Sequence, residues 1–281
     1  MIHTLNQERL PELNGGGIKP LDMPRYRIEF PPPAGDDPDQ HEAFFFLADA
    51  DGRTRIRFHD YAEIYERRGL YEQLFYDRLK CKSPTKVADV LQRAVLKDHE
   101  HPSELRVLDL GAGNGMVGEE LAARGVSRLV GVDIIEEAKD ATIRDRPGIY
   151  DHYYVADFTN VGDELRTELQ SWSFNCMVSV AALGFGDIPP RAVAEAMNLV
   201  EVGGWIAFNI KETFLDAKDK SGFSKMVRQL IFSEYLDLHH LERYQHRFSI
   251  DGSPLKYFAI VGRKTADTLP DEVMETVFAN D

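Results

Sequence analysis

The sequence predicts an α/β fold built on a doubly wound, mostly parallel sheet, and three observations lead to this class. From about residue 105, short apolar runs alternate with amphipathic helical segments, which is the pattern of βαβ crossovers. A glycine-rich turn joins the first apolar run to the first helix. Two long segments around Asp251-Gly252 end this alternation and predict an antiparallel hairpin.

The first 60 residues predict a small β-rich extension. Tyr26 to Phe30 alternates in polarity, which indicates a short strand. Asp49-Ala50-Asp51-Gly52 separates the apolar run Ala43–Leu47 from the alternating run Arg53–His59, and this arrangement predicts a β-hairpin. The extension is expected either to cover the main domain or to provide a separate binding surface.

Helices are predicted between this extension and the core. Tyr61 and Tyr65 lie one helical turn apart, and Gly69 is expected to separate their helix from the next. Ser83-Pro84 predicts the start of a further helix, with the serine as cap and the proline in its first turn. The polar segment 97–104 is the best candidate for a linker. We therefore divide the chain into a β-rich extension (1–60), a helical cap (61–103), a core (104–264) and an acidic tail (265–281).

The core is predicted to contain seven strands and five intervening helices. The strands are Leu105–Leu110, Arg128–Val132, Tyr153–Val155, Phe174–Val180, Trp205–Ile210, Leu238–Ile250 and Leu255–Val261. The helices are Val117–Ala123, Glu136–Arg144, Gly162–Gln170, Arg191–Leu199 and Phe223–Phe232.

Composition narrows the possible partners. The 281 residues include 33 basic and 47 acidic side chains, a net charge of −14, which disfavours binding to a polyanion such as nucleic acid. The two cysteines, Cys81 and Cys176, have no metal-ligand spacing, so no metal site is expected. No signal peptide or membrane-spanning run is recognised, and a cytoplasmic protein is expected.

The sharpest motif is Val107–Gly115, with sequence VLDLGAGNG. Gly111, Gly113 and Gly115 stand at every second position, where they permit a tight turn and close approach of a ligand to the backbone. The helix that follows can offer free N–H groups to an anion. Gly113-x-Gly115-x-x-Gly118 also fits a dinucleotide pattern, but the G-x-G-x-G spacing from Gly111 does not, which disfavours an NAD-dependent oxidoreductase.

Acidic residues follow the next two strands. Asp133 ends the second strand, 24 residues after Asp109, and can accept both hydroxyls of a ribose; alternatively it caps the next helix. Asp157 and Phe158 follow the third strand, where they can contact an adenine, or can be a turn acid and a core aromatic. Ligands of open parallel sheets bind beyond these carboxyl ends.

Together these segments resemble the class I, Rossmann-like, S-adenosylmethionine-dependent methyltransferases, of the type that acts on small molecules. The resemblance is carried by VLDLGAGNG (Val107–Gly115), VGVDI (Val130–Ile134), ADF (Ala156–Phe158), LVEVGGWIAF (Leu199–Phe208) and the closing hairpin. It implies a seven-stranded sheet of order 3-2-1-4-5-7-6 with strand 7 antiparallel.

The resemblance also implies S-adenosylmethionine as cofactor and assigns residues to it. Asp109, Gly111, Gly113 and Gly115 would hold the methionine part, Asp133 the ribose, Ile134, Asp157 and Phe158 the adenine, and Val180 and Ala181 would line the reacting face.

The acceptor side is less defined. Tyr61 and Tyr65 could cap the donor through cation–π attraction, or could be core residues of their helix. Asn209 could face a substrate or belong to a loop. The segment Gly184–Pro190 lacks the Asn/Asp-Pro-Pro-aromatic pattern that many amino-group methyltransferases carry, and no catalytic base is named.

The leading interpretation is a methyltransferase that transfers a methyl group to an O, N or S atom of a small, neutral or cationic molecule. A protein or nucleic-acid methyltransferase of the same fold, and a non-catalytic S-adenosylmethionine- or nucleotide-binding module, are the alternatives. The oligomeric state is not predicted.

Overall fold

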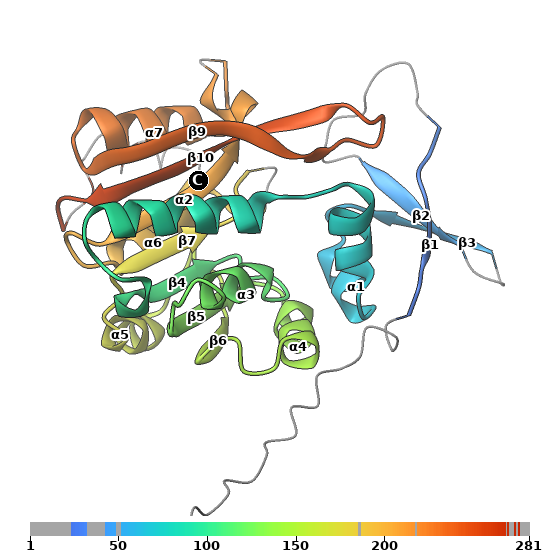
Figure 1. Ribbon diagram of the computed structural model, residues 1–281, viewed down its shortest axis with the longest axis horizontal. Coiled ribbons are helices and arrows are strands. Elements are labelled where there is room, and N and C mark those ends of the chain that lie inside the picture. The colour runs from blue at the N-terminus through green and yellow to red at the C-terminus, as the bar shows by residue number, and fades with distance from the viewer. Residues whose placement is uncertain are drawn as a thin grey trace, which may run out of the picture.

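The computed structural model describes residues 24–32, 43–48, 52–184, 187–216, 218–267, 269, 273 and 275. Within these ranges the chain forms a seven-stranded sheet flanked by helices and a separate three-stranded sheet (Figure 1). The large sheet consists of β4 (Arg106–Leu110), β5 (Arg128–Asp133), β6 (His152–Val155), β7 (Cys176–Ser179), β8 (Trp205–Lys211), β9 (Leu236–Phe248) and β10 (Pro254–Lys264).

The strand order of the large sheet is β6-β5-β4-β7-β8-β10-β9. Strands β4 to β8 pair in parallel, whereas β10 pairs antiparallel to both β8 and β9. When the seven strands are numbered along the chain, this order is 3-2-1-4-5-7-6 with strand 7 antiparallel, so the predicted topology is confirmed. The order reverses between β4 and β7, and the carboxyl ends of both strands meet at one edge, where a ligand site is expected.

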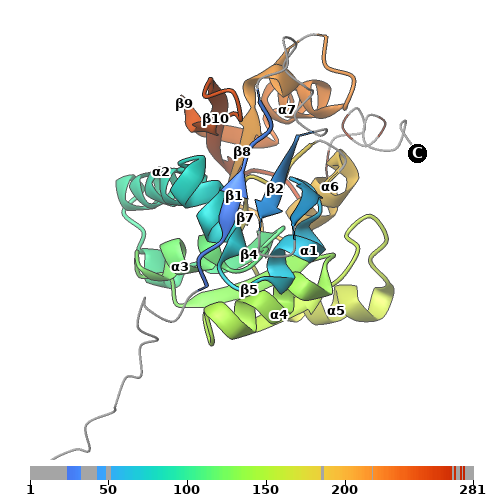
Figure 2. The ribbon, with the colours of Figure 1, turned by 90° about the vertical axis from the view of Figure 1, so that its right-hand side faces the viewer.

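Helices cover both faces of the sheet, as Figure 2 shows. Helices α2 (Ser83–Lys97) and α3 (Met116–Ala122) bury apolar side chains such as Val90, Leu91 and Leu121 against one face. Helices α5 (Asp163–Ser171), α6 (Pro190–Asn198) and α7 (Phe223–Phe232) pack on the other face. Buried strands between two helical layers explain why the strand segments are near-continuous apolar runs.

The N-terminal extension has an apolar core of its own. Strands β1 (Arg27–Glu29), β2 (Phe44–Ala48) and β3 (Arg53–Arg57) form an antiparallel sheet, which confirms the predicted strand and hairpin pairing. The turn residues 49–51 lie outside the described residues. Helix α1 (Tyr61–Glu66) and a π-helical segment, Glu72–Arg78, pack onto this sheet, and Gly69 separates them with a φ of 75°. We refer to this sheet and the helical residues 61–78 together as the extension.

Two local expectations change in the structure. Ser83 does not cap α2, because Lys82 holds that position and no side chain caps the helix. The Ser83 hydroxyl is instead 2.7 Å from the Tyr244 hydroxyl and 2.5 Å from Nδ1 of His246. Within the segment 97–104, Glu100 accepts hydrogen bonds from Trp205 and Arg263, so this polar stretch is tied to the core sheet.

Polar contacts hold the extension against the core. Glu72 accepts hydrogen bonds from Asn114 of the glycine loop (2.8 Å) and from Arg146 (2.9 Å). Arg144 of α4 (Glu136–Asp145) donates to the backbone carbonyl of Tyr65 (3.0 Å). These bonds place α1 beside the carboxyl edge of the large sheet. Among the described residues, no helix is both long enough and apolar enough to cross a membrane.

Candidate functional site

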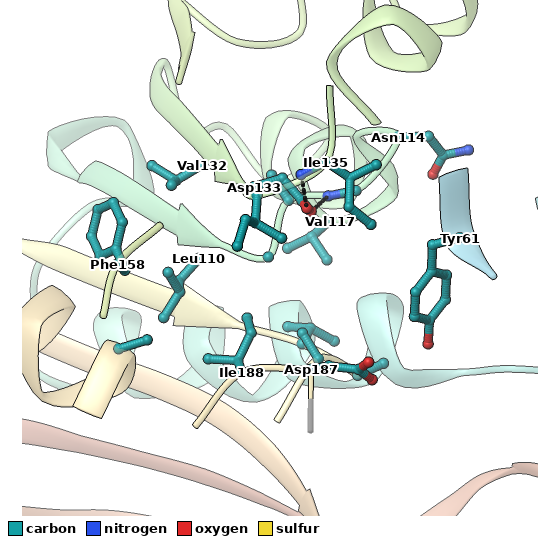
Figure 3. A pocket seen from close by; sticks show the side chains of 18 of the residues that line it. Tyr61, Leu110, Asn114, Val117, Val132, Asp133, Ile135, Phe158, Asp187 and Ile188 are labelled. Carbon is teal, nitrogen blue, oxygen red and sulfur yellow. Dashed lines mark hydrogen bonds between the residues drawn. The ribbon is translucent and has the colours of Figure 1, made fainter. Parts of the chain in front are cut away.

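A cavity of about 350 Å³ opens at the carboxyl edge, between the large sheet and the extension. The ends of β4, β5, β6 and β7 form one side of it, and tyrosines of the extension form the other. Figure 3 shows Asp133, Phe158 and Leu110 on the sheet side, Asp187 and Ile188 on the segment after β7, and Tyr61 facing them. The cavity therefore lies at the switch point of strand order.

The glycine loop shapes one wall of this cavity. Gly111 and Gly113 have φ values of 76° and 54°, in the left-handed region that favours glycine. A Cβ on Gly113 would lie 2.6 Å from the Tyr65 hydroxyl, and one on Gly111 would lie 2.7 Å from Ala182 and Ile188. Both positions therefore require glycine for backbone conformation and for space.

Asp133 reaches from the end of β5 to this loop. One carboxylate oxygen accepts a hydrogen bond from the backbone N–H of Gly113 (2.9 Å), and the other accepts one from Ile135 (3.1 Å). Burial raises the pKa of Asp133, and the backbone donors act in the opposite direction. Because Asp133 also lines the cavity, its oxygens can accept further hydrogen bonds from a ligand hydroxyl.

The residues expected near an adenine also line the cavity. The Ile134 side chain is 62% exposed, which is unusual for isoleucine and leaves an apolar surface for a flat ligand. Phe158 is buried at the end of the cavity, and Asp157 is exposed with its carboxylate bonded to the backbone and hydroxyl of Thr159. These bonds lower the pKa of Asp157 and keep it ionised.

Three of the predicted site residues do not line the cavity. Asp109 is fully buried beneath the loop, where the Tyr150 hydroxyl donates to one oxygen (2.6 Å) and burial raises the pKa of the carboxyl to about 7. Gly115, with a φ of 86°, precedes α3 and faces Arg146 and Ile149. Asp109 and Gly115 thus support the loop from below and do not line the cavity.

Asn209, the third of these residues, is buried and points into a polar network. Its side-chain oxygen accepts a hydrogen bond from the backbone N–H of Ala181 (2.6 Å), and its amide donates to Ser83 (3.0 Å) and Tyr244 (2.7 Å). Ala181 has a φ of 59°, a strained conformation for a residue other than glycine, and it lines the cavity beside Val180. Asn209 therefore holds the cavity wall rather than facing a substrate.

Four tyrosines of the extension cover the cavity: Tyr61, Tyr65, Tyr71 and Tyr76. The rings of Tyr61 and Tyr65 are stacked with centroids 6.1 Å apart, and those of Tyr65 and Tyr71 are 5.2 Å apart. Burial raises the pKa of Tyr61 and Tyr65 well above the usual value, so both phenols stay protonated at physiological pH. They provide aromatic faces and hydroxyl donors but no base.

A smaller cavity of about 40 Å³ adjoins the main one and shares Tyr61, Tyr71, Ala181 and Asp187 with it. At this junction Nδ1 of His59 lies 2.9 Å from one carboxylate oxygen of Asp187 and 3.1 Å from the other. The pair was not foreseen, because its members are 128 positions apart and belong to the extension and to the segment after β7. No local spacing signals such a pair.

Comparison with known proteins agrees with this architecture. Residues 108–208 match the family described as "Methyltransferase domain". The ubiquinone biosynthesis O-methyltransferase of Burkholderia vietnamiensis is 26% identical over 114 residues, which are 41% of this chain and 47% of that protein. That of Burkholderia ambifaria is 26% identical over 111 residues, 40% of this chain and 46% of that protein. The chain thus spans about half the length of the curated relatives it matches.

Solved structures with a similar outline include two methyltransferases. N-methyltransferase NodS from Bradyrhizobium japonicum WM9, in complex with S-adenosyl-L-homocysteine, aligns with a TM-score of 0.45 at 15% identity, covering 64% of this chain and 87% of that one. Magnesium protoporphyrin IX methyltransferase from Synechocystis PCC 6803, with bound S-adenosylmethionine, aligns with a TM-score of 0.44 at 12% identity, covering 64% and 79%. Together, the methyltransferase domain matched over residues 108–208, the strand order and the glycine loop support a class I S-adenosylmethionine-dependent methyltransferase.

Proposed function

We propose that this protein transfers a methyl group from S-adenosylmethionine to a small-molecule acceptor. The observation that carries this proposal is the cavity itself, in which the glycine loop and Asp133 face the covering tyrosines. The loop offers a backbone that a ligand can approach closely, and Asp133 offers acceptors for two hydroxyls.

The residues present fit this cofactor. Asp133 would hold the ribose, and Ile134 and Phe158 would enclose the adenine from the exposed and the buried side. Gly111 and Gly113 would leave room for the methionine part along the loop, with Asp109 and Gly115 shaping the loop beneath it. Val180 and Ala181 would border the reacting face.

The sulfonium supplies an already activated methyl group, so the protein has to position the acceptor in line and exclude water. Tyr61 and Tyr65, whose rings are stacked and line the cavity, would attract a cationic donor through their aromatic faces. S-adenosylmethionine would supply the methyl group to the acceptor atom with loss of its S–C bond, and a protonated acceptor would give up its proton to a base.

His59 is the side chain best placed to take that proton. In the tautomer that carries its proton on Nδ1, this ring donates to the Asp187 carboxylate and can accept a proton at Nε2. Asp187 would stabilise the imidazolium that forms and orient the ring, and the proton would leave to solvent with the product. The curated relatives are O-methyltransferases, which favours a hydroxyl acceptor for which such a base is useful.

The covered cavity favours a small acceptor over a macromolecule. Four tyrosines line the cavity opposite the sheet edge and narrow the space beside the reacting face, which favours an acceptor of small size. The net charge of −14 also disfavours nucleic acid. A non-catalytic module is disfavoured by the His59–Asp187 pair, which a pure binding site does not need.

Two experiments test the proposal. Isothermal titration with S-adenosylmethionine, S-adenosylhomocysteine and NAD should show binding of the first two; tighter binding of NAD would contradict it. A metabolite extract incubated with the protein and a donor labelled in the methyl group should yield a labelled small molecule. Label found only in protein or nucleic acid would favour the macromolecular alternative, and absence of any labelled product would favour the binding module.

A further inference from the structure

Arg247 is a buried arginine near the end of β9, and it lines the smaller cavity. Only 5% of the residue is exposed. Its guanidinium carbon lies 5.4 Å from the ring centroid of Phe58 and 5.9 Å from that of Phe75, so two aromatic rings of the extension hold it in place. Arginine is rarely buried unless an anion accompanies it.

No such anion is present in the part of the chain that the structure describes. The guanidinium donates a hydrogen bond to the backbone carbonyl of Phe248 (2.8 Å), and no carboxylate of the described residues lies within ion-pair distance of it. Asp187, the one carboxylate among the described residues lining this cavity, is bonded to His59. Burial holds the pKa of the neighbouring His246 well below its usual range, so that ring is neutral. Among the described residues, therefore, no carboxylate compensates the charge of Arg247.

A β-bulge directs Arg247 into the cavity. In the ladder between β9 and β10, Arg247 pairs with Leu255 and Gln245 pairs with Lys256, so His246 is the extra residue. His246 and Arg247 are consecutive, yet both are buried and both line the smaller cavity. In a regular strand consecutive side chains point to opposite faces, and bulges commonly re-aim a side chain beside an active site.

The size of the smaller cavity limits the group that Arg247 can bind. A volume of about 40 Å³ holds about three waters, so the cavity admits a small anionic group such as a carboxylate. We infer that the methyl acceptor carries a carboxylate, which enters this cavity and pairs with Arg247, while the body of the acceptor extends past Tyr61 and Asp187 into the main cavity. This inference rests on the proposed methyltransferase function.

In this arrangement the group that binds the acceptor lies apart from the place where the methyl group is transferred. An acceptor anchored at Arg247 would pass the His59–Asp187 pair at the junction of the two cavities and present its nucleophile to the reacting face beside Ala181. Guanidinium and carboxylate can form two parallel hydrogen bonds, which fix orientation as well as affinity. A neutral or cationic acceptor, the class favoured by the overall acidic charge, would leave Arg247 without a carboxylate partner among the described residues.

The test compares matched acids and amides on the full chain saturated with S-adenosylhomocysteine. The probes are 4-hydroxybenzoate against 4-hydroxybenzamide, and 3-hydroxybutyrate against its amide, measured by isothermal titration. We expect at least one acid to bind more tightly than its amide by about tenfold or more, since a charge-assisted pair is lost in the amide. Failure of both acids to bind, or equal binding of acid and amide, would overturn the inference.

Variants then assign the preference to Arg247. Arg247→Gln should abolish the acid preference and leave affinity for S-adenosylhomocysteine within about twofold. Arg243→Gln is the matched control, because Arg243 lies on the same strand but is half exposed and pairs with Glu212. An acid preference that persists in folded Arg247→Gln would overturn the assignment. If that variant does not fold, the comparison of acids with amides on the wild-type protein still tests the carboxylate inference.

The methyltransferase proposal and the carboxylate inference can fail independently of each other. If the protein binds neither S-adenosylmethionine nor its product, the methyltransferase proposal fails, whatever the acid preference. If the cofactor binds and the acids do not, only the carboxylate inference fails.

Discussion

Nδ1 of His59 lies 2.9 Å from a carboxylate oxygen of Asp187, which joins the end of the N-terminal hairpin to the segment after β7. The two residues are 128 positions apart, and they meet where the two cavities adjoin. The N-terminal extension thus brings a histidine–carboxylate pair to the junction of the two cavities.

If His59 takes the proton of the acceptor, His59→Gln should lower kcat by about 10²- to 10⁴-fold, with little change in affinity for S-adenosylmethionine. Asp187→Asn should cause a smaller loss, because it leaves the imidazole in place but removes the charge that stabilises its protonated form. The measurement is steady-state turnover with the labelled donor, together with titration of the cofactor.

A suitable control for that experiment is His152→Gln, which changes an exposed histidine of β6. Turnover should be unchanged in this variant. The pH profile of kcat gives a second readout, because the limb that reports deprotonation of the base should disappear in His59→Gln. Full activity of His59→Gln would exclude the residue as base.

Replacement of Asp133 by alanine should weaken binding of S-adenosylmethionine by about 10- to 100-fold, since hydrogen bonds to a charged acceptor are lost. Asp133→Asn should weaken it less, because one oxygen acceptor remains. Titration calorimetry measures both variants, and Asp140→Asn, an exposed acid on α4, is the control. Wild-type affinity in Asp133→Ala would mean that the ribose site lies elsewhere.

Gly113→Ala should abolish measurable cofactor binding, because its Cβ would lie 2.6 Å from the Tyr65 hydroxyl in a backbone with a φ of 54°. Gly125→Ala is a matched control, since Gly125 also has a positive φ of 94° but nothing lies within 4 Å of its Cβ. The control should lose about 1 kcal/mol of unfolding free energy and keep the cofactor.

A second variant separates collision from backbone strain at Gly113. Adding Tyr65→Phe to Gly113→Ala removes the hydroxyl and leaves the ring carbon 3.5 Å from the new Cβ, which is an ordinary contact. We expect the double variant to regain part of the cofactor affinity. If the double variant binds no better than Gly113→Ala, backbone strain alone explains the loss.

Asp109 makes folding stability depend on pH. Burial raises the pKa of Asp109 to about 7 in the folded state, against 3.8 for an unperturbed carboxyl. Between these values the folded protein holds a proton that the unfolded chain has lost, so stability falls as pH rises, by up to roughly 1.4 kcal/mol per pH unit. Above about pH 7 the buried carboxylate is charged in the folded protein, and the loss of unfolding free energy is complete.

Asp109→Asn should remove this part of the pH dependence. Denaturant unfolding of the wild type and the variant at pH 5, 6, 7 and 8 measures it, and the difference in unfolding free energy should shift in favour of the variant as pH rises. A parallel pH dependence in both proteins would show that Asp109 keeps an ordinary pKa.

Much of the core could be predicted because its signals are local. The alternation of apolar runs and amphipathic segments marked each strand and helix from β4 to β10, and helix α7 was predicted with both ends correct. The motif around Gly111 indicated where the chain turns beside a ligand, because positive φ and missing Cβ atoms select glycine. The serine at the start of α2 was misassigned because Ser83 bonds to Tyr244 and His246, residues remote in sequence.

The sequence by itself determined the fold class, the strand order through its family resemblance, and the position of the glycine loop, because these follow from short periodic patterns and a contiguous motif. Only the tertiary structure decided what the long-range contacts bring together: His59 with Asp187, Asn209 with Ala181, and Arg247 in a cavity without a described carboxylate partner. The physical reason is that packing of the extension onto the sheet edge sets these distances, and no spacing along the chain encodes them.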